Sequence, residues 1–338
     1  IRMVTGRGPP RMQRNGFDGR AFSDRVGLVA RPSPVFDAYW FADYSGAASP
    51  SAQQKAIRVV EAVGARPPRE VVGPFTRAAL RARTLEWLLK ADRRGERVVL
   101  GFDHQVGLPW GLARELGLEG LDGLAALRAF VAGDYAADAP AVDQPGTFAR
   151  AFNDWCVARK RPPYFYSAIR GRAWGLPTRD PRRDEARAGS TRFRLCEKSA
   201  SPTGRGTPKP LNRVGDNGSV GGQSLLGWVE LVRLLDDAAA AGVKLRVWPL
   251  DGLDLAGPAY GSGHVLVETY PAAVRDIDVP YDDLNDAQAA ALFVQRTDRA
   301  GRLLETLDLG RLEPDARARV RFEGWIAGFG CCGDLRSR

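Results

Sequence analysis

Residues 37–46 read "DAYWFADYSG", and the fold is inferred outward from this stretch. The run from Ala38 to Ala42 is rich in aromatic residues and has few polar ones, which is typical of a strand buried on both faces. Asp43 ends the run, and Ser45 and Gly46 follow at once. Three roles are open for Asp43: a metal ligand at the end of a central strand, part of a phosphate-binding loop, or a simple cap or turn former.

The flanking sequence predicts an α/β fold. Before residue 104 we expect strands at 56–65, 69–75 and 97–103 and an amphipathic helix at 76–94. After residue 213 we expect a helix ending near 242, strands at 244–251 and 263–271, and helices at 282–301 and 314–327. Together these elements predict a mixed sheet flanked by helices, in a single domain over residues 36–330.

The other segments are less regular. Residues 104–213 predict a long insertion with helices at 111–132 and 147–160, followed by a stretch rich in Pro, Gly and Arg. Residues 1–35 lack periodicity and are expected to be a disordered extension, and residues 331–338 a C-terminal tail.

Composition narrows the classes of protein. No run approaches the roughly 20 apolar residues that a membrane span needs, and the start lacks the apolar core of a secretory signal, so we expect a cytoplasmic protein without a membrane partner. Four irregularly spaced cysteines and two histidines predict neither a disulfide framework nor a zinc site. Any metal is then expected among oxygen ligands, which suits Mg²⁺ or Mn²⁺.

Positive charge is concentrated in one segment. Residues 156–213 hold fifteen Lys and Arg and four acidic residues, a net of +11, whereas the whole chain carries +9. One interpretation is a nucleic-acid-binding arm, with phosphate contacts from Lys160, Arg161, Arg170, Arg172, Lys198 and Arg213. The other is a solvated loop in a chain whose cations are mostly arginine, 43 Arg against 6 Lys.

Carboxylates recur at chemically informative positions. Asp43 and Asp103 each end a predicted strand, Glu268 lies late in another, and Asp283 and Asp286 share one helix face. Clustered carboxylates repel one another unless a cation neutralises them. A pair of divalent ions about 3.5–4 Å apart does so and also promotes phosphodiester cleavage.

Each acid also has a structural interpretation. Asp43 and Asp103 are suited to turns or caps. Glu268 is suited to an ion pair with an arginine such as Arg275, and Asp283 and Asp286 to the start of a helix.

Three further features carry alternatives. "GDNGSVGGQS" (215–224) either holds a phosphate on its backbone amides or is a flexible start to a helix. "KRPPYFYSAIRGRAW" (160–174) either stacks bases or contributes buried aromatics to the insertion. His104 either assists the acids as base or ligand or makes a structural hydrogen bond, and we favour the latter.

The order strand-Asp, strand-Asp, strand-Glu, helix-Asp resembles the ribonuclease H-like fold. "DDLNDAQAAAL" (282–292) is similar to the final helix of RuvC-type junction resolvases. More narrowly, the chain resembles the predicted nucleases of domain-of-unknown-function family 429 over about residues 38–330. The matching pieces are "ADYSGA", "VLGFDHQVGLP", "GSVGGQSLLG", "VWPLDG", "VETYPAAV", "DDLNDAQAAAL" and "EGWIAGF".

The resemblance implies a metal-dependent nuclease site at Asp43, Asp103, Glu268 and Asp286, with Asp283 beside them. His104 and Gln105 depart from the pattern, because small apolar residues are expected there. The leading hypothesis is therefore a Mg²⁺- or Mn²⁺-dependent nuclease acting on DNA or RNA. The alternatives are a non-catalytic nucleic-acid-binding module and, through the "DYSG" loop, an ATP-binding phosphotransferase of the actin-like or sugar-kinase type.

Overall fold

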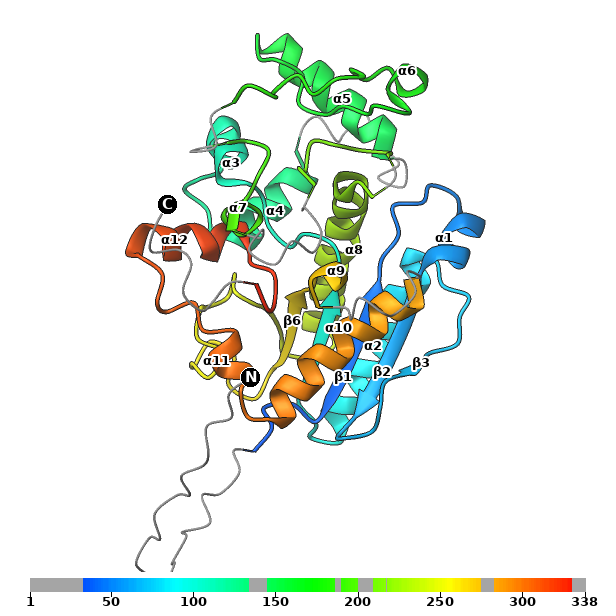
Figure 1. Ribbon diagram of the computed structural model, residues 1–338, viewed down its shortest axis with the longest axis vertical. Coiled ribbons are helices and arrows are strands. Elements are labelled where there is room, and N and C mark those ends of the chain that lie inside the picture. Colours follow the sequence, from blue (N-terminus) through cyan, green and yellow to red (C-terminus); the bar gives the residue numbers. More distant parts are fainter. Residues whose placement is uncertain are drawn as a thin grey trace, which may run out of the picture. The chain divides into compact units, whose positions relative to one another are not determined.

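Strand β1 (Ala38–Asp43) lies inside a six-stranded mixed sheet, and all six of its side chains are buried, as its apolar sequence predicts. The computed structural model describes residues 33–133, 145–185, 190–199, 209–216, 218–274 and 283–329. These residues belong to one compact unit with helices on both faces of the sheet, which confirms the predicted α/β class (Figure 1). Most of the predicted extension 1–35 and the tail 331–338 lie outside the described residues.

Helices separate the strands along the chain, except between β2 and β3 and between β5 and β6. The other strands are β2 (Arg58–Val63), β3 (Arg69–Glu70), β4 (Val98–Phe102), β5 (Leu245–Val247) and β6 (His264–Glu268). The helices are α1 (Pro50–Ala56), α2 (Arg77–Arg93), α3 (Trp110–Leu116), α4 (Gly123–Val131), α5 (Pro145–Ala158), α6 (Gly171–Trp174), α7 (Leu195–Ser199), α8 (Val220–Ala240), α9 (Pro271–Val274), α10 (Asp283–Arg299), α11 (Leu303–Thr306) and α12 (Pro314–Glu323).

The sheet has the strand order β3-β2-β1-β4-β6-β5. β2 runs antiparallel to both β1 and β3, whereas β1, β4, β6 and β5 are parallel to one another. Parallel strands end at the same edge of a sheet, so the residues that follow β1, β4 and β6 meet there.

Alternation along β1 divides the core into two layers. Ala38 and Trp40 point toward α2 and α8, whereas Tyr39 and Phe41 belong to the cluster that α10 covers on the other face. In Figure 1, α10 crosses one face of the sheet diagonally, and it contacts both β1 and β2. Successive side chains of a strand point to opposite faces of the sheet, and β1 has large apolar residues on both faces. Both faces of β1 are therefore buried, which is typical of a strand inside the sheet.

Local capping explains where the structure departs from the expected elements. Helix α1 was not predicted; Ser49 caps it and Pro50 occupies its first turn. The expected helix at 111–132 is two helices, because Gly117 adopts a left-handed conformation that ends α3 and Asp122 caps α4. β3 and β5 are also shorter than their sequence windows, with two and three residues.

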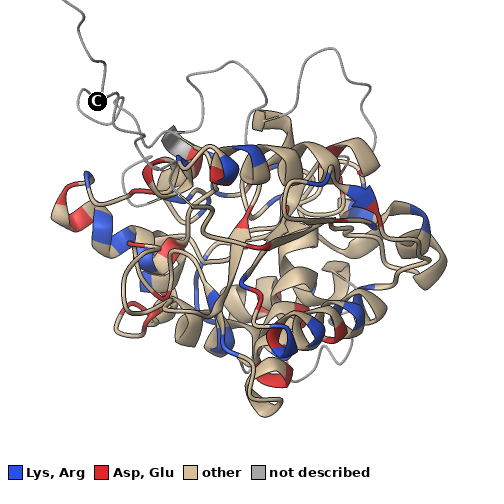
Figure 2. Cartoon of the chain, turned by 90° about the horizontal axis from the view of Figure 1, so that it is seen from below, with Lys and Arg blue, Asp and Glu red and all other residues tan. Residues whose placement is uncertain are grey.

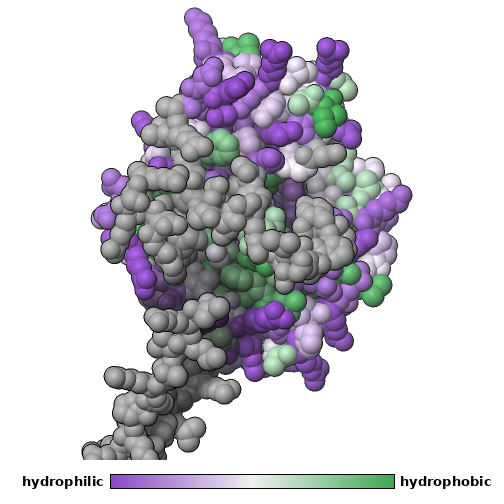
Figure 3. Space-filling model, in the orientation of Figure 1, coloured by the Kyte–Doolittle hydropathy of each residue, from purple (hydrophilic) through white to green (hydrophobic). Residues whose placement is uncertain are grey.

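The insertion packs into the same core as the sheet. Phe130, Phe148 and Phe152, from α4 and α5, form a buried aromatic group in which Phe130 meets Trp228 of α8 edge-on. Its outer surface is mostly hydrophilic over α5 and α6, with isolated apolar residues (Figure 3). Among the described residues, no helix has the length and apolar content that crossing a membrane requires.

Candidate active site

A cavity of about 870 Å³ opens at the carboxyl ends of β1 and β4. Four of the five predicted acids line it: Asp43, Asp103, Asp283 and Asp286. The remaining walls come from the loop after β1, from α1, from the insertion, from the first turn of α8 and from the start of α9. The structure therefore brings together acids that are up to 243 positions apart in the sequence.

Asp43 and Asp103 form a hydrogen-bonded pair of carboxyl groups. Burial and the neighbouring charge of Asp103 raise the pKa of Asp43 well above its ordinary value, and the carboxylates at the start of α10 raise it further. Burial also raises the pKa of Asp103, but the hydrogen bonds that Asp103 accepts oppose this rise. A proton shared by the pair is therefore favoured on Asp43.

Two further donors orient the Asp103 carboxylate. The Tyr44 amide donates to its Oδ1 at 2.6 Å, and Gln223 Nε2 donates to its Oδ2 at 2.7 Å. Gln223 Nε2 also donates to the Tyr44 carbonyl at 2.7 Å, so the first turn of α8 is joined to the loop after β1. Gln223 carries no individual signal in the sequence, although it lies in the glycine-rich stretch 215–224.

Helix α10 supplies the other two acids from its first turn, where Asp286 is buried and Asp283 half-buried. The far end of the helix is fixed to the start of β1, because Asp298 accepts hydrogen bonds from Tyr39 Oη at 2.7 Å and from the Phe36 amide at 3.0 Å. Anchoring one end of α10 sets where its other end lies, which is beside Asp43.

The loop after β1 is held by a buried arginine at the start of α2. Arg77 Nη1 donates to the carbonyls of Ser45 and Ala47 at 3.1 and 2.7 Å. A Cβ at Gly46 would lie 3.2 Å from the backbone nitrogen of Gln223, so glycine permits this loop to approach α8 closely. The loop is thus a fixed wall of the cavity.

Glu268 does not join the group of acids, and this corrects the expectation that it is a catalytic residue and metal ligand. Phe102 pairs with both Ala42 and Glu268 across the sheet, so the row that contains Asp43 and Asp103 continues to Thr269 and not to Glu268. A shift of one residue turns a side chain to the opposite face. Glu268 is absent from the residues that line the cavity.

The Glu268 carboxylate instead forms a buried ion pair. Arg194 donates to its two oxygens at 2.5 and 2.6 Å, and the Val106 amide donates to Oε2 at 3.0 Å. The alternative interpretation, an ion pair with an arginine, is therefore right, but the partner is Arg194. The suggested partner, Arg275, lies outside the described residues.

His104 is a structural residue, as we favoured. Its ring is buried, Nδ1 lies 2.9 Å from the Gln105 carbonyl, and burial lowers its pKa to about 4. It does not line the cavity of the four acids, so the departure from the small apolar residues expected at this position has a packing role.

Several arginines of the basic segment are paired within the fold. Arg213 Nε lies 2.8 Å from Asp216, and buried Arg182 and Arg194 contact Glu115 and Glu268. Figure 2 shows blue and red residues interspersed along the helices. Part of the net charge of +11 is therefore compensated by acids outside the segment.

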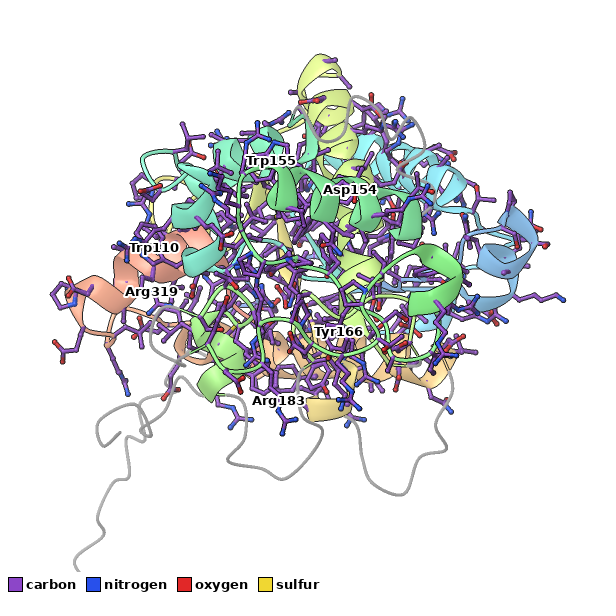
Figure 4. The ribbon with its side chains drawn as sticks, turned by 90° about the horizontal axis from the view of Figure 1, so that it is seen from above. Trp110, Asp154, Trp155, Tyr166, Arg183 and Arg319 are labelled. Atoms are coloured by element: carbon purple, nitrogen blue, oxygen red, sulfur yellow. The ribbon has the colours of Figure 1, made fainter. Side chains whose placement is uncertain are left out.

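The six predicted phosphate contacts have different environments. Of the five whose side chains the structure describes, Arg170 alone lines the cavity. Lys160 and Arg172 are exposed, and the Arg161 guanidinium lies 5.6 Å from the ring of Trp155, which Figure 4 labels on α5. Arg213 is paired as described, and the side chain of Lys198 lies outside the described residues.

The aromatic and glycine-rich stretches are divided between packing and the cavity. Tyr164 and Phe165 are fully buried, which favours the packing interpretation for these two residues. Trp174, in contrast, lines the cavity, as do most residues of the glycine-rich stretch. Lys209 also lines it, and no sequence signal had distinguished it from the other cations of the segment.

The donor chemistry of the cavity fits a hard cation, because carboxylate oxygens are the ligands that Mg²⁺ and Mn²⁺ prefer. Burial and the neighbouring carboxylates both raise the pKa of Asp43, and a bound cation would favour its charged form. Among the residues that the structure describes, no three His, Cys, Asp or Glu side chains are already grouped so as to hold a metal ion.

The chain was also compared with known proteins. No protein-family model, no curated protein and no solved structure matches it. The resemblance to family 429 thus rests on the short motifs in the sequence, and the function has to be argued from the cavity.

Proposed function

We propose that the protein is a divalent-metal-dependent phosphodiesterase that acts on nucleic acid. One observation carries this proposal: Asp43, Asp103, Asp283 and Asp286 line one cavity at the carboxyl edge of parallel strands. That edge is the usual ligand-binding edge of an open α/β sheet. Four carboxylates together are costly unless they have a cationic ligand.

We also propose that the sheet belongs to the ribonuclease H-like class. Three features support this assignment: a second strand antiparallel to the first, parallel β1 and β4 followed by acids, and a late helix across β1 with acids in its first turn. Glu268 is not part of the proposed ligand set, because Arg194 already neutralises it.

The proposed roles follow from the contacts of each residue. Asp43, Asp103, Asp283 and Asp286 are the residues that would hold one or two Mg²⁺ or Mn²⁺ ions. When bound, such ions polarise a phosphodiester and make water more acidic. Gln223 and the Tyr44 amide keep the Asp103 carboxylate in one orientation. A bound cation would favour loss of the Asp43 proton to solvent, so that both carboxylates would be charged.

Cleavage of labelled DNA and RNA with Mg²⁺ or Mn²⁺ tests the proposal. We expect Asp43→Asn and Asp286→Asn to abolish cleavage, and the exposed Asp315→Asn, outside the cavity, to retain it. Excess EDTA should stop cleavage by the wild type. Full activity in Asp43→Asn or in EDTA would contradict the proposal.

A further inference from the structure

The cavity of the four aspartates also has a cationic wall. Arg170 and Lys209, both from the insertion, line it together with Trp174. Arg170 is exposed and Lys209 is half-buried. A single cavity therefore offers carboxylates from the sheet and α10, and cations and an aromatic ring from the insertion.

The backbone that presents Arg170 is held in place by Asp216. The buried Asp216 carboxylate accepts from Ser167 Oγ at 2.6 Å and from the Ile169 amide at 2.9 Å. Ser167 Oγ in turn accepts from the Arg170 amide at 2.9 Å. Asp216 also pairs with Arg213, so its own charge is compensated and Arg170 is not its partner in this turn. Arg170 therefore extends from a turn whose backbone is fixed by hydrogen bonds.

Two glycines make room for the indole of Trp174. A Cβ at Gly215 would lie 2.2 Å from its ring atoms, and a Cβ at Gly146 would lie 2.5 Å from them. The Arg170 guanidinium lies 5.8 Å from the centre of the ring. The wall thus places a cation beside an aromatic ring, the combination that binds single-stranded nucleic acid by phosphate contact and base stacking.

The size of the cavity limits what can enter it. About 870 Å³ is within the range of roughly 300–1,000 Å³ that small-molecule sites occupy. A nucleotide or two fits such a volume, whereas a base-paired helix does not enter it. Lys160 and Arg161, two of the predicted phosphate contacts, follow the end of α5 and do not line the cavity.

We infer that the cavity takes a short, unpaired phosphodiester strand of one or two nucleotides, with a phosphate held by Arg170 and Lys209 and a base stacked on Trp174. The inference rests on the proposed function, because the scissile phosphodiester is the group next to the four aspartates. Arg170, Lys209 and Trp174 define the substrate class, and the aspartates define the reaction.

Binding measured without turnover separates the two proposals. The full chain in EDTA is titrated with a fluorescent thymidine dinucleotide, a labelled single-stranded 20-mer and the same 20-mer as a duplex. We expect the dinucleotide and the single strand to bind and the duplex to bind more weakly. Arg170→Gln and Lys209→Gln should each weaken dinucleotide binding about tenfold, the loss expected for one charged hydrogen bond.

Arg172→Gln is the matched control, since Arg172 is an exposed arginine two residues away that does not line the cavity. It should leave the affinity unchanged, and thermal melting should show all three variants folded. Equal effects of Arg170→Gln and Arg172→Gln, or tighter binding of duplex than of single strand, would overturn the inference. Binding that depends on Arg170 without cleavage under any metal would uphold the ligand class and overturn the proposed phosphodiesterase activity.

Discussion

At the scale of the residue, Glu268 shows how one position along a strand changes a role. Its carboxylate is buried against Arg194, which also contacts Glu197 and the Glu323 carbonyl. Removing one partner of a buried ion pair leaves an uncompensated charge in a medium of low polarity. The pair therefore joins the insertion to the end of β6, and its loss should lower the free energy of unfolding.

We predict that Arg194→Met lowers the free energy of unfolding by about 3–5 kcal/mol. The double variant Arg194→Met/Glu268→Gln should recover part of this loss, because it removes one of the two carboxylates that lose Arg194, the other being Glu197, and keeps an acceptor for the Val106 amide. Urea unfolding of the wild type, both single variants and the double variant gives the coupling. Additive losses would show that the ion pair contributes little.

At the scale of the element, His264 links the start of β6 to β4. Its buried ring accepts a hydrogen bond from the Val98 amide through Nδ1 at 3.2 Å, with Asp92 at 3.7 Å from Nε2. Burial lowers its pKa, although Asp92 opposes this, and Arg97 adds to the lowering. Protonation would remove the acceptor that the Val98 amide needs.

Because the folded state disfavours protonated His264, its contribution to stability is complete above its ordinary pKa of about 6.5 and is lost as the pH falls toward the lowered value. We expect the free energy of unfolding to fall between pH 7 and pH 5, by at most about 1.4 kcal/mol per pH unit from this group. His264→Asn keeps an acceptor that does not titrate, so it should show a smaller loss than wild type. Parallel curves for the two proteins would contradict this.

At the scale of the whole molecule, the four aspartates come from β1, the end of β4 and α10, so a cation bound among them would hold these elements together. Mn²⁺ at about 100 times its dissociation constant should raise the free energy of unfolding by about 2.7 kcal/mol. Asp103→Asn should lose this stabilisation, whereas Asp315→Asn should keep it. Equal stabilisation of both variants would place the ion elsewhere.

The sequence by itself predicted the central strand, most of the long flanking helices and four of the acids that line the cavity. Alternating apolar residues and helical spacing are local signals, and residues such as Thr76, which caps α2, could be identified from their neighbours alone. Asp43 and Asp103 could be placed because a polar residue directly after a buried strand lies at the edge of the sheet.

Only the tertiary structure decided which charges are available. The pairing of Phe102 with Glu268 turned Glu268 to the face opposite the acids, and register between distant strands leaves no local signal. The same holds for the basic segment, where Arg194 is buried against Glu268 while Arg170 lines the cavity. The sequence does not distinguish an arginine in a buried ion pair from one that lines a cavity, because the difference lies in partners that only folding brings near.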